Sequence, residues 1–261
     1  MTEPLRSILG GMDRVAVAVS GGVDSLTLAT VAHEVLGPRA TMHHATSPAV
    51  PLEATRRTSA LAEARGWALD VFDAGEFADP RYRANPVNRC FFCKMNLYAA
   101  IGARTDAQVV SGTNLDDLGD YRPGLDAARD HGVRHPFVEA GITKAMLRRL
   151  AVELALGEVA ELPASPCLSS RIETGIAIEP PVLAMIDAAE TRLRALLSAR
   201  TVRCRVRAWA VVVELDPETL SALDPEPVRG EIAALAIQAG ISLPVSFAPY
   251  RTGSAFLRAA P

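Results

Sequence analysis

The chain has 261 residues, 49% of them hydrophobic, and a formal net charge of −3. It is long enough to bury one large core or two modest ones, and its charge does not favour nucleic acid as a partner. The first residues are too polar for a signal peptide and no apolar run is long enough to span a membrane, so we expect a cytoplasmic protein. Four cysteines do not make a disulfide scaffold in a chain of this size, which leaves metal, redox or sulfur chemistry.

Strands and helices alternate in the first part of the chain. Apolar runs predict buried strands, and helical patterns that end at glycine or proline predict helices. The expected strands are 14–19, 40–45, 68–72 and 107–111, and the expected helices are 24–36, 53–65 and 93–103. This order predicts an α/β, Rossmann-like parallel sheet covered on both faces, with ligands bound beyond the carboxyl ends of its strands.

The pattern changes near residue 180. A helix is expected over 180–198, followed by strands over 201–207 and 209–215, a helix over 226–239 and a strand over 241–247. We therefore predict a nucleotide-binding domain over 1–179 and a small α+β domain over 180–261, which would serve substrate binding or oligomerisation.

The segment SGGVDS, residues 20–25, joins the first strand to the first helix. Its two glycines, Gly21 and Gly22, permit positive φ and leave room for an incoming group. The free N–H groups of the helix start attract anions, and Asp24 and Ser25 add a carboxylate and a hydroxyl. Walker-type and G-x-G-x-x-G motifs are absent from the sequence. We therefore interpret the turn as a phosphate site of another class, rather than an ordinary capped turn.

Three cysteines lie in polar motifs. Cys90 and Cys93 are separated by two residues, a spacing that suits one metal centre or a reversible disulfide. Cys167 lies in a proline-marked loop with Arg171 close behind, which would favour a nucleophilic thiolate. The alternative for each cysteine is a small buried apolar residue. We assign that role to Cys204, because strand alternation places it on an apolar face.

The same alternation places the arginines of strand 201–207, among them Arg205 and Arg207, on the opposite face. Aligned guanidinium groups can bind phosphate or carboxylate, although a solvated strand face is the alternative. At the start of another expected helix, Thr143 is a candidate N-cap and Lys144 opposes the helix dipole. A bound anion or a nearby carboxylate would compensate that charge. His43 and His44 are expected to be packing residues rather than metal ligands.

SGGVDS resembles the PP-loop of the ATP pyrophosphatases, which cleave ATP between the α and β phosphates and adenylate an acceptor. The ordered set SGGVDS, NRCFFCK, SGTNLDDLGDYRPG, GITKAMLRRLA and PCLSSRI, within residues 12–215, is similar to the LarE family. These are ATP-dependent sulfur-insertion enzymes of nickel-pincer nucleotide biosynthesis. The resemblance implies adenylation of pyridinium-3,5-biscarboxylic acid mononucleotide and conversion of its carboxylates to thiocarboxylates.

The resemblance also implies roles for individual residues. ATP would be bound by Ser20, Gly21, Gly22, Asp24, Ser25, Thr113, Asn114 and Lys144. Asp24 and Asp117 would hold Mg²⁺, although the segment 111–117 also fits a capped helix start. Arg205 and Arg207 match the R-x-R that meets the nucleotide substrate, and Cys167, Cys90, Cys93 and Arg171 would form the sulfur-transferring centre.

The source of sulfur separates two variants of the family. One sacrifices the sulfur of its own cysteine, here Cys167. The other holds a [4Fe-4S] cluster on three cysteines, which Cys90, Cys93 and Cys167 match, and a persulfide stays possible. The family often forms homo-oligomers. The alternatives are a tRNA-thiolating or other PP-loop adenylating enzyme, and an adenine-nucleotide sensor without catalysis.

Overall fold

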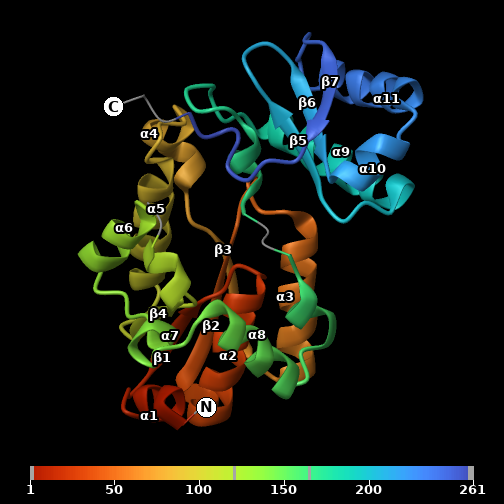
Figure 1. Ribbon diagram of the computed structural model, residues 1–261. Helices are drawn as coiled ribbons and strands as arrows, with labels where there is room; N and C mark the ends of the chain where they lie inside the picture. The colour runs from red at the N-terminus through yellow and green to blue at the C-terminus, as the bar shows by residue number, and fades with distance from the viewer. Residues whose placement is uncertain (1–2, 120–121, 164–165, 258–261) are drawn as a thin grey trace. The chain divides into compact units, whose positions relative to one another are not determined.

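The computed structural model describes residues 3–119, 122–163 and 166–257 (Figure 1). The chain divides into two compact units. The first comprises residues 1–79 and 90–165, and the second comprises 80–89 and 166–261. A short piece of the N-terminal half, residues 80–89, thus folds with the C-terminal part of the chain.

The first unit is built on a four-stranded sheet of order β3-β2-β1-β4. The strands are β1 (Val15–Ala18), β2 (Ala40–Thr46), β3 (Ala68–Asp73) and β4 (Gln108–Ser111). All three pairings are parallel, which confirms the predicted α/β, Rossmann-like sheet. In the register of β1 with β4, Ala18 is opposite Ser111. The segments that follow these two strands therefore begin side by side.

The first unit also contains helices and short 3-10 segments, some of which connect these strands. They are α1 (Glu3–Gly10), α2 (Val23–Leu36), η1 (Gly37–Arg39), α3 (Leu52–Arg65), η2 (Glu76–Ala78), α5 (Arg89–Gly102), η3 (Leu115–Gly119), α6 (Gly124–Asp130), α7 (Pro136–Glu139), α8 (Lys144–Glu153) and η4 (Gly157–Glu161).

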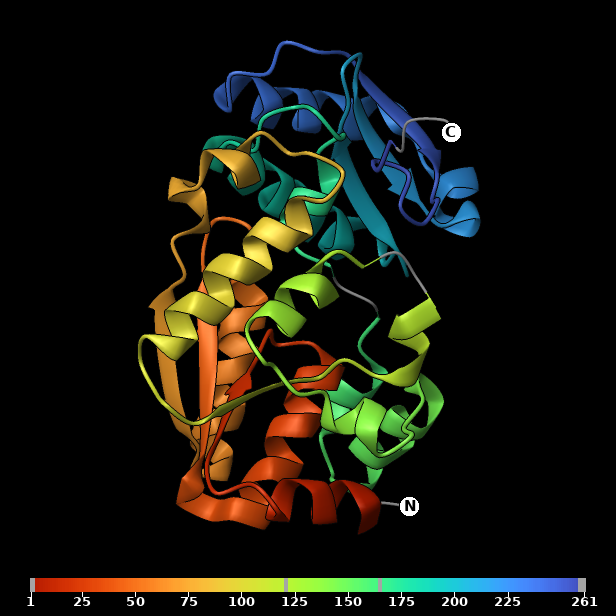
Figure 2. The ribbon, with the colours of Figure 1, turned by 90° about the vertical axis from the view of Figure 1, so that its left-hand side faces the viewer.

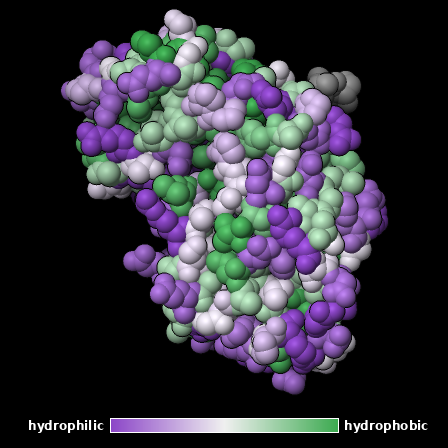
Figure 3. Space-filling view, turned by 180° about the vertical axis from the view of Figure 1, so that it is seen from behind, coloured by the Kyte–Doolittle hydropathy of each residue, from purple (hydrophilic) through white to green (hydrophobic). Residues whose placement is uncertain are grey.

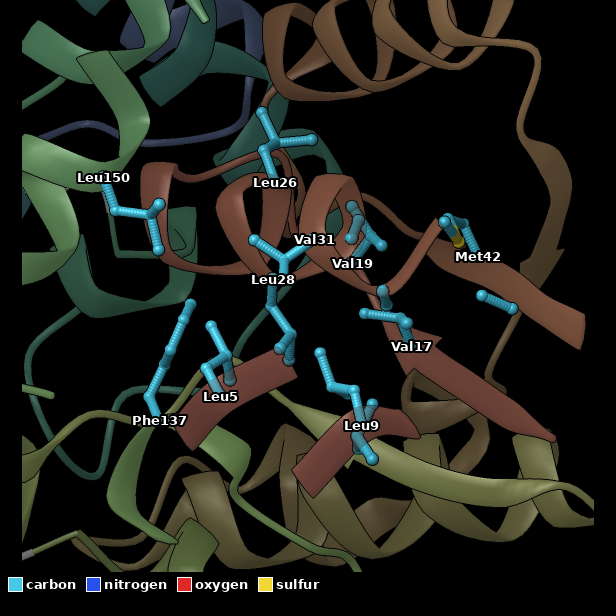
Figure 4. Close-up of a cluster of buried hydrophobic side chains, with 14 of the residues drawn as sticks. Leu5, Leu9, Val17, Val19, Leu26, Leu28, Val31, Met42, Phe137 and Leu150 are labelled. Carbon is cyan, nitrogen blue, oxygen red and sulfur yellow. The ribbon is translucent and has the colours of Figure 1, made fainter. Parts of the chain in front are cut away.

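The two faces of the sheet have separate cores, because successive side chains of β1 point to opposite faces. Val15 and Val17 pack with the buried residues of α1, α2, α7 and α8 (Figure 4). Ala16 and Ala18 pack with α5 and α6 in a second cluster, and Figure 2 shows α5, in yellow, lying along the sheet. Coverage on both faces explains why β1 is apolar throughout its length.

The second unit has a three-stranded sheet of order β5-β6-β7. Its strands are β5 (Val202–Val206), β6 (Val211–Leu215) and β7 (Val245–Pro249), with β5 antiparallel and β7 parallel to β6. The unit also contains α4 (Pro80–Arg83), η5 (Leu168–Arg171), α9 (Pro180–Leu197), α10 (Pro217–Ala222) and α11 (Pro225–Gln238). This confirms the predicted smaller α+β region.

Two predicted boundaries are wrong. Helix α5 begins at Arg89 rather than near residue 93, so it includes both cysteines of NRCFFCK. The last strand begins at Val245 rather than at Ile241. Pro244 explains the late start, since proline has no N–H to donate within a sheet.

Within the described parts of the chain, no helix is both long and apolar enough to cross a membrane. On the face that Figure 3 shows, clusters of hydrophobic residues lie between hydrophilic ones.

Candidate functional site

In the glycine turn between β1 and α2, the backbone at Gly21 fits only glycine. Gly21 has φ of 79°, and a Cβ at this position would lie 2.6 Å from the carbonyl oxygen of Ala54. Gly22 is the N-cap of α2, with no side-chain hydrogen bond capping the helix. A helix start without a side-chain cap suits an anion, because its N–H groups and the helix dipole both attract negative charge.

Serine hydroxyls hold the turn closed. Ser25 Oγ accepts from the Ser20 N–H at 3.0 Å, donates to the Gly22 carbonyl at 3.1 Å and lies 3.2 Å from Ser20 Oγ. Arg57, which lies on α3, donates to the carbonyl of Gly21 at 2.7 Å. The structure thus uses Ser25, which is buried, to shape the turn.

The segment after β4 packs directly on the start of α2. A Cβ on Gly112 would lie 2.9 Å from the carbonyl carbon of Asp24 and from the nitrogen of Ser25. Thr113 and Asn114 follow Gly112, so this close approach places them beside the glycine turn. Their position agrees with the parallel pairing of β1 and β4, whose carboxyl ends are adjacent.

Asn114 and Asp117 support each other within this segment. The side-chain amide and the N–H of Asn114 donate to Asp117 Oδ2 at 3.0 and 3.1 Å, and Asp117 pairs with Arg122 at 2.7 Å. Asn114 is 1% exposed. Its side chain therefore fixes the orientation of the Asp117 carboxylate.

Lys144 connects the start of α8 to the glycine turn. Its Nζ forms an ion pair with Asp24 Oδ1, and its N–H donates to Asp116 Oδ2 at 2.6 Å. Thr143 is the N-cap of α8, as predicted, with its side chain accepting from the Met146 N–H. Carboxylates thus compensate the lysine, one of the two alternatives that the sequence left open.

The charges around Asp24 are coupled. Burial raises the pKa of Asp24, the hydrogen bond and charge of Lys144 lower it, and the charge of Asp117 raises it again. Two carboxylates and one ammonium group are therefore close enough to affect each other's charge. A carboxylate pair suits Mg²⁺, which commonly takes one or two carboxylates together with phosphate oxygens.

Cys90 and Cys93 both lie on α5, three residues apart and so on the same side of the helix. Both thiols are half-buried. Cys167 is also half-buried and free, and it belongs to the second unit. Among the residues that the structure describes, no three histidine, cysteine or acidic side chains form a group that could hold a metal ion.

Arg171 holds the backbone of the Cys167 loop. It is 1% exposed, and its Nε and Nη2 donate to the two carboxylate oxygens of Glu190 at 2.9 and 3.0 Å. Its Nη1 donates to the carbonyls of Pro166 and Cys167 at 2.7 and 3.3 Å. Arg171 therefore acts on Cys167 through the main chain of the loop.

Arg205 of β5 and Arg207, which follows the strand, lie in a buried network rather than on a solvated strand face. Arg205 donates to Glu214 at 2.7 Å and to the carbonyl of Arg251 at 3.1 Å. Arg207 donates to Glu214 at 3.1 Å and to the carbonyl of Ser254 at 2.9 Å. Burial alone would raise the pKa of Glu214, but the Ser254 hydroxyl and Arg205 hold it below its ordinary value.

The pairing of Glu214 with these arginines was not predicted from the sequence. The available signal was a single carboxylate in the apolar strand VVVEL, where a charged residue needs a partner once buried. Cys204 and His44 have the packing roles that the sequence predicts. Cys204 is fully buried, which raises the pKa of its thiol, and His44 contacts the Val19 carbonyl and Thr55 Oγ1.

No protein-family model matches the chain. Three relatives each span most of it. An uncharacterised protein of Synechocystis sp. is 38% identical over 234 residues, covering 88% of this chain and 87% of the relative. The pyridinium-3,5-bisthiocarboxylic acid mononucleotide synthase of Lactiplantibacillus plantarum is 32% identical over 216 residues, covering 81% and 78%. An uncharacterised protein of Methanocaldococcus jannaschii is 25% identical over 209 residues, covering 78% and 79%. The chain therefore belongs to the LarE family, the family of that synthase.

Proposed function

We propose that the protein is an ATP-dependent sulfur transferase. It would adenylate the carboxylates of pyridinium-3,5-biscarboxylic acid mononucleotide and convert them to thiocarboxylates. The observation that carries the proposal is the uncapped start of α2 with Asp24, Asp117 and Lys144 gathered beside it. It occurs in a chain whose relative is named for the bisthiocarboxylic acid product.

The first step is proposed at the glycine turn. A substrate carboxylate oxygen attacks the α-phosphorus of ATP, the bond to the bridging oxygen breaks, and pyrophosphate leaves. The N–H groups at the start of α2 would bind the phosphates, with Ser20, Gly21, Gly22 and Ser25 shaping the turn and Thr113 and Asn114 beside it. Asp24 and Asp117 would hold Mg²⁺, and Lys144, released from Asp24, would offset phosphate charge.

The second step is displacement of AMP. A sulfur nucleophile attacks the acyl carbon, the carbon–sulfur bond forms and the bond to AMP breaks, which yields the thiocarboxylate once the sulfur is freed from its donor. AMP makes the acid reactive because it is a far better leaving group than oxide. Cys167 is the proposed centre of this step, and Arg171 would hold its loop in place.

We propose Cys90, Cys93 and Cys167 as ligands of a [4Fe-4S] cluster. The donor chemistry fits, because three thiolates leave one iron without a protein ligand. When bound, the cluster would supply that iron as a carrier of an additional sulfide. Two of the thiols belong to α5, and the third belongs to the residue before η5.

Arg205 and Arg207 are the proposed contacts for the anionic substrate. The predicted domain 180–261, which lies within the second unit, would provide substrate binding or oligomer contacts. A cytoplasmic homo-oligomer is part of the same proposal.

Pyrophosphate release tests the proposal. Wild-type protein with ATP, Mg²⁺ and the pyridinium dicarboxylate nucleotide should release pyrophosphate and AMP, and Asp24→Asn should slow release at least about a hundredfold. Release that requires tRNA instead would favour the tRNA-thiolating alternative. ATP binding without any release would favour the sensor.

The sulfur source needs its own experiment. Protein purified without oxygen should be brown and contain iron and sulfide, and Cys90→Ala should lose the colour. Iron-free protein that is fully active and loses the mass of one sulfur atom per turnover would instead show sacrifice of Cys167.

A further inference from the structure

A buried arginine of the second unit has donors without acceptors. Arg89 is 1% exposed. Its Nη1 donates to Asn85 Oδ1 at 2.8 Å. Its Nε and Nη2 are buried and have no hydrogen-bond partner among the residues that the structure describes. A buried guanidinium with unsatisfied donors is unfavourable, so its presence needs an explanation.

The two free nitrogens form one edge of the guanidinium. Nε and Nη2 point their N–H bonds in parallel, which is the geometry that grips two oxygens of a carboxylate or a phosphate. The same unit shows what this edge binds when it is occupied. In Arg171, Nε and Nη2 each donate to one oxygen of Glu190, at 2.9 and 3.0 Å. Arg89 presents the same edge without such a partner.

Asn85 holds Arg89 in position. It is fully buried and has φ of 54°, a backbone conformation that costs free energy in a residue other than glycine. Its Nδ2 donates to the carbonyls of Glu173 and Ile176, both at 2.9 Å, and its own carbonyl accepts from the Gly175 N–H. This anchorage fixes the Oδ1 that binds Arg89 Nη1 and so directs the remaining edge.

Residues 254–256 form a short segment beside Arg89. The ring of Phe256 lies 4.2 Å from Arg89 Cζ, a cation–π contact that offsets part of the buried charge. The neighbouring Ala255 carbonyl accepts from the Thr174 N–H at 3.0 Å, and the Ser254 carbonyl accepts from Arg207. One short segment therefore lies against Arg89 and against an arginine already proposed to bind substrate.

We propose that Arg89 is a further binding residue, which grips an oxyanion of the ligand with its Nε and Nη2. The assignment of that oxyanion to the substrate rests on the proposed function, under which the substrate carries two carboxylates and a phosphate. The ligand replaces the missing acceptor, as Glu190 does for Arg171. Because both nitrogens are buried, the segment around Phe256 shifts when the ligand enters.

Binding measured by calorimetry with two probes tests this assignment. Pyridine-3,5-dicarboxylate offers carboxylates alone and ribose 5-phosphate offers phosphate alone. Arg89→Gln keeps a donor for Asn85 but removes the edge, and Arg89→Lys keeps the charge but not the paired geometry. Each of these two variants should bind at least one of the probes tenfold or more weakly than the wild type. Arg192→Gln, which removes an exposed arginine paired with Glu231, is the control and should leave both affinities unchanged.

Thermal unfolding separates binding from a structural role. Arg89→Gln should melt at the wild-type temperature or above, because it removes an uncompensated buried charge. Unchanged affinity for both probes in Arg89→Gln, no binding of either probe by the wild type, or a clear fall in melting temperature would overturn the inference. Affected binding in a protein that releases no pyrophosphate would keep Arg89 as an oxyanion site and reject the proposed function.

Discussion

The glycine turn of the first unit and the arginine network of the second are candidate anion sites that are built in different ways. The turn relies on main-chain N–H groups and on residues that follow two neighbouring strands. The network relies on side chains with partners far away in the sequence, as Arg205 with the carbonyl of Arg251 and Arg207 with the carbonyl of Ser254. A site made of backbone depends on conformation at single positions, whereas a site made of side chains depends on charge pairing.

The strongest expected effect concerns charge pairing in the second unit. Glu190→Gln leaves the buried Arg171 without its carboxylate, so the free energy of unfolding should fall by about 3–5 kcal/mol. Chemical denaturation measures it. Glu231→Gln breaks the exposed pair with Arg192 and should cost less than about 1 kcal/mol. Equal losses in the two variants would remove the distinction between buried and exposed pairs.

The matched test in the first unit concerns backbone conformation. Gly21→Ala forces a Cβ to within 2.6 Å of the Ala54 carbonyl at positive φ, so it should cost about 2 kcal/mol or more and weaken ATP binding. Gly22→Ala is the control, since its Cβ would meet only Ser20 Oγ at 3.6 Å. If both variants denature alike, the turn is not restricted by its backbone.

Within the glycine-turn site, neighbouring charges affect the protonation of Asp24. Lys144 lowers the pKa of Asp24, which burial raises. Lys144→Gln should therefore raise that pKa further, so the carboxylate protonates at a higher pH than in the wild type. Carbon-13 NMR of the aspartate carboxyl groups measures the shift. Arg148→Gln should move it in the same direction by less, because its charge is the weakest of the named influences. A downward shift in Lys144→Gln contradicts the assigned pair.

The pH dependence of stability follows from the same group. Because the folded pKa of Asp24 is raised, the folded state binds its proton more readily than the unfolded state does. Asp24 therefore opposes folding at neutral pH, and this contribution disappears as pH falls below both values. Asp24→Asn should keep or increase stability at pH 7, measured by denaturation. A large loss of stability would show that the pair with Lys144 outweighs burial.

The smallest effect is a difference in thiol reactivity. Cys204 is fully buried with a raised pKa, so it should stay unmodified by iodoacetamide in the folded protein. Cys90, Cys93 and Cys167 are half-buried and should react in protein from which any cluster has been removed. Mass spectrometry of the peptides reads the result, and modification of Cys204 before the others would contradict its assignment to the core.

The same contrast explains what the sequence could predict. The sheet, the glycine turn and the Thr143 cap follow from patterns within a few residues, and the structure confirms them. The pairing of Arg205 with Glu214 depends on which strands meet, and the free edge of Arg89 depends on the fold of residues 80–89 with the C-terminal part. Neither feature is marked by a sequence pattern within a few residues. Strand alternation correctly placed Cys204 inward but could not show that the opposite face is also buried.

In the proposed reaction, a carboxylate made reactive by AMP receives sulfur. Substrate labelled with oxygen-18 in its carboxylates tests it directly, because the attacking oxygen stays with AMP when sulfur displaces it. AMP that carries oxygen-18 should form together with thiocarboxylate and pyrophosphate. Unlabelled AMP, or ADP as the nucleotide product, would contradict the proposed reaction.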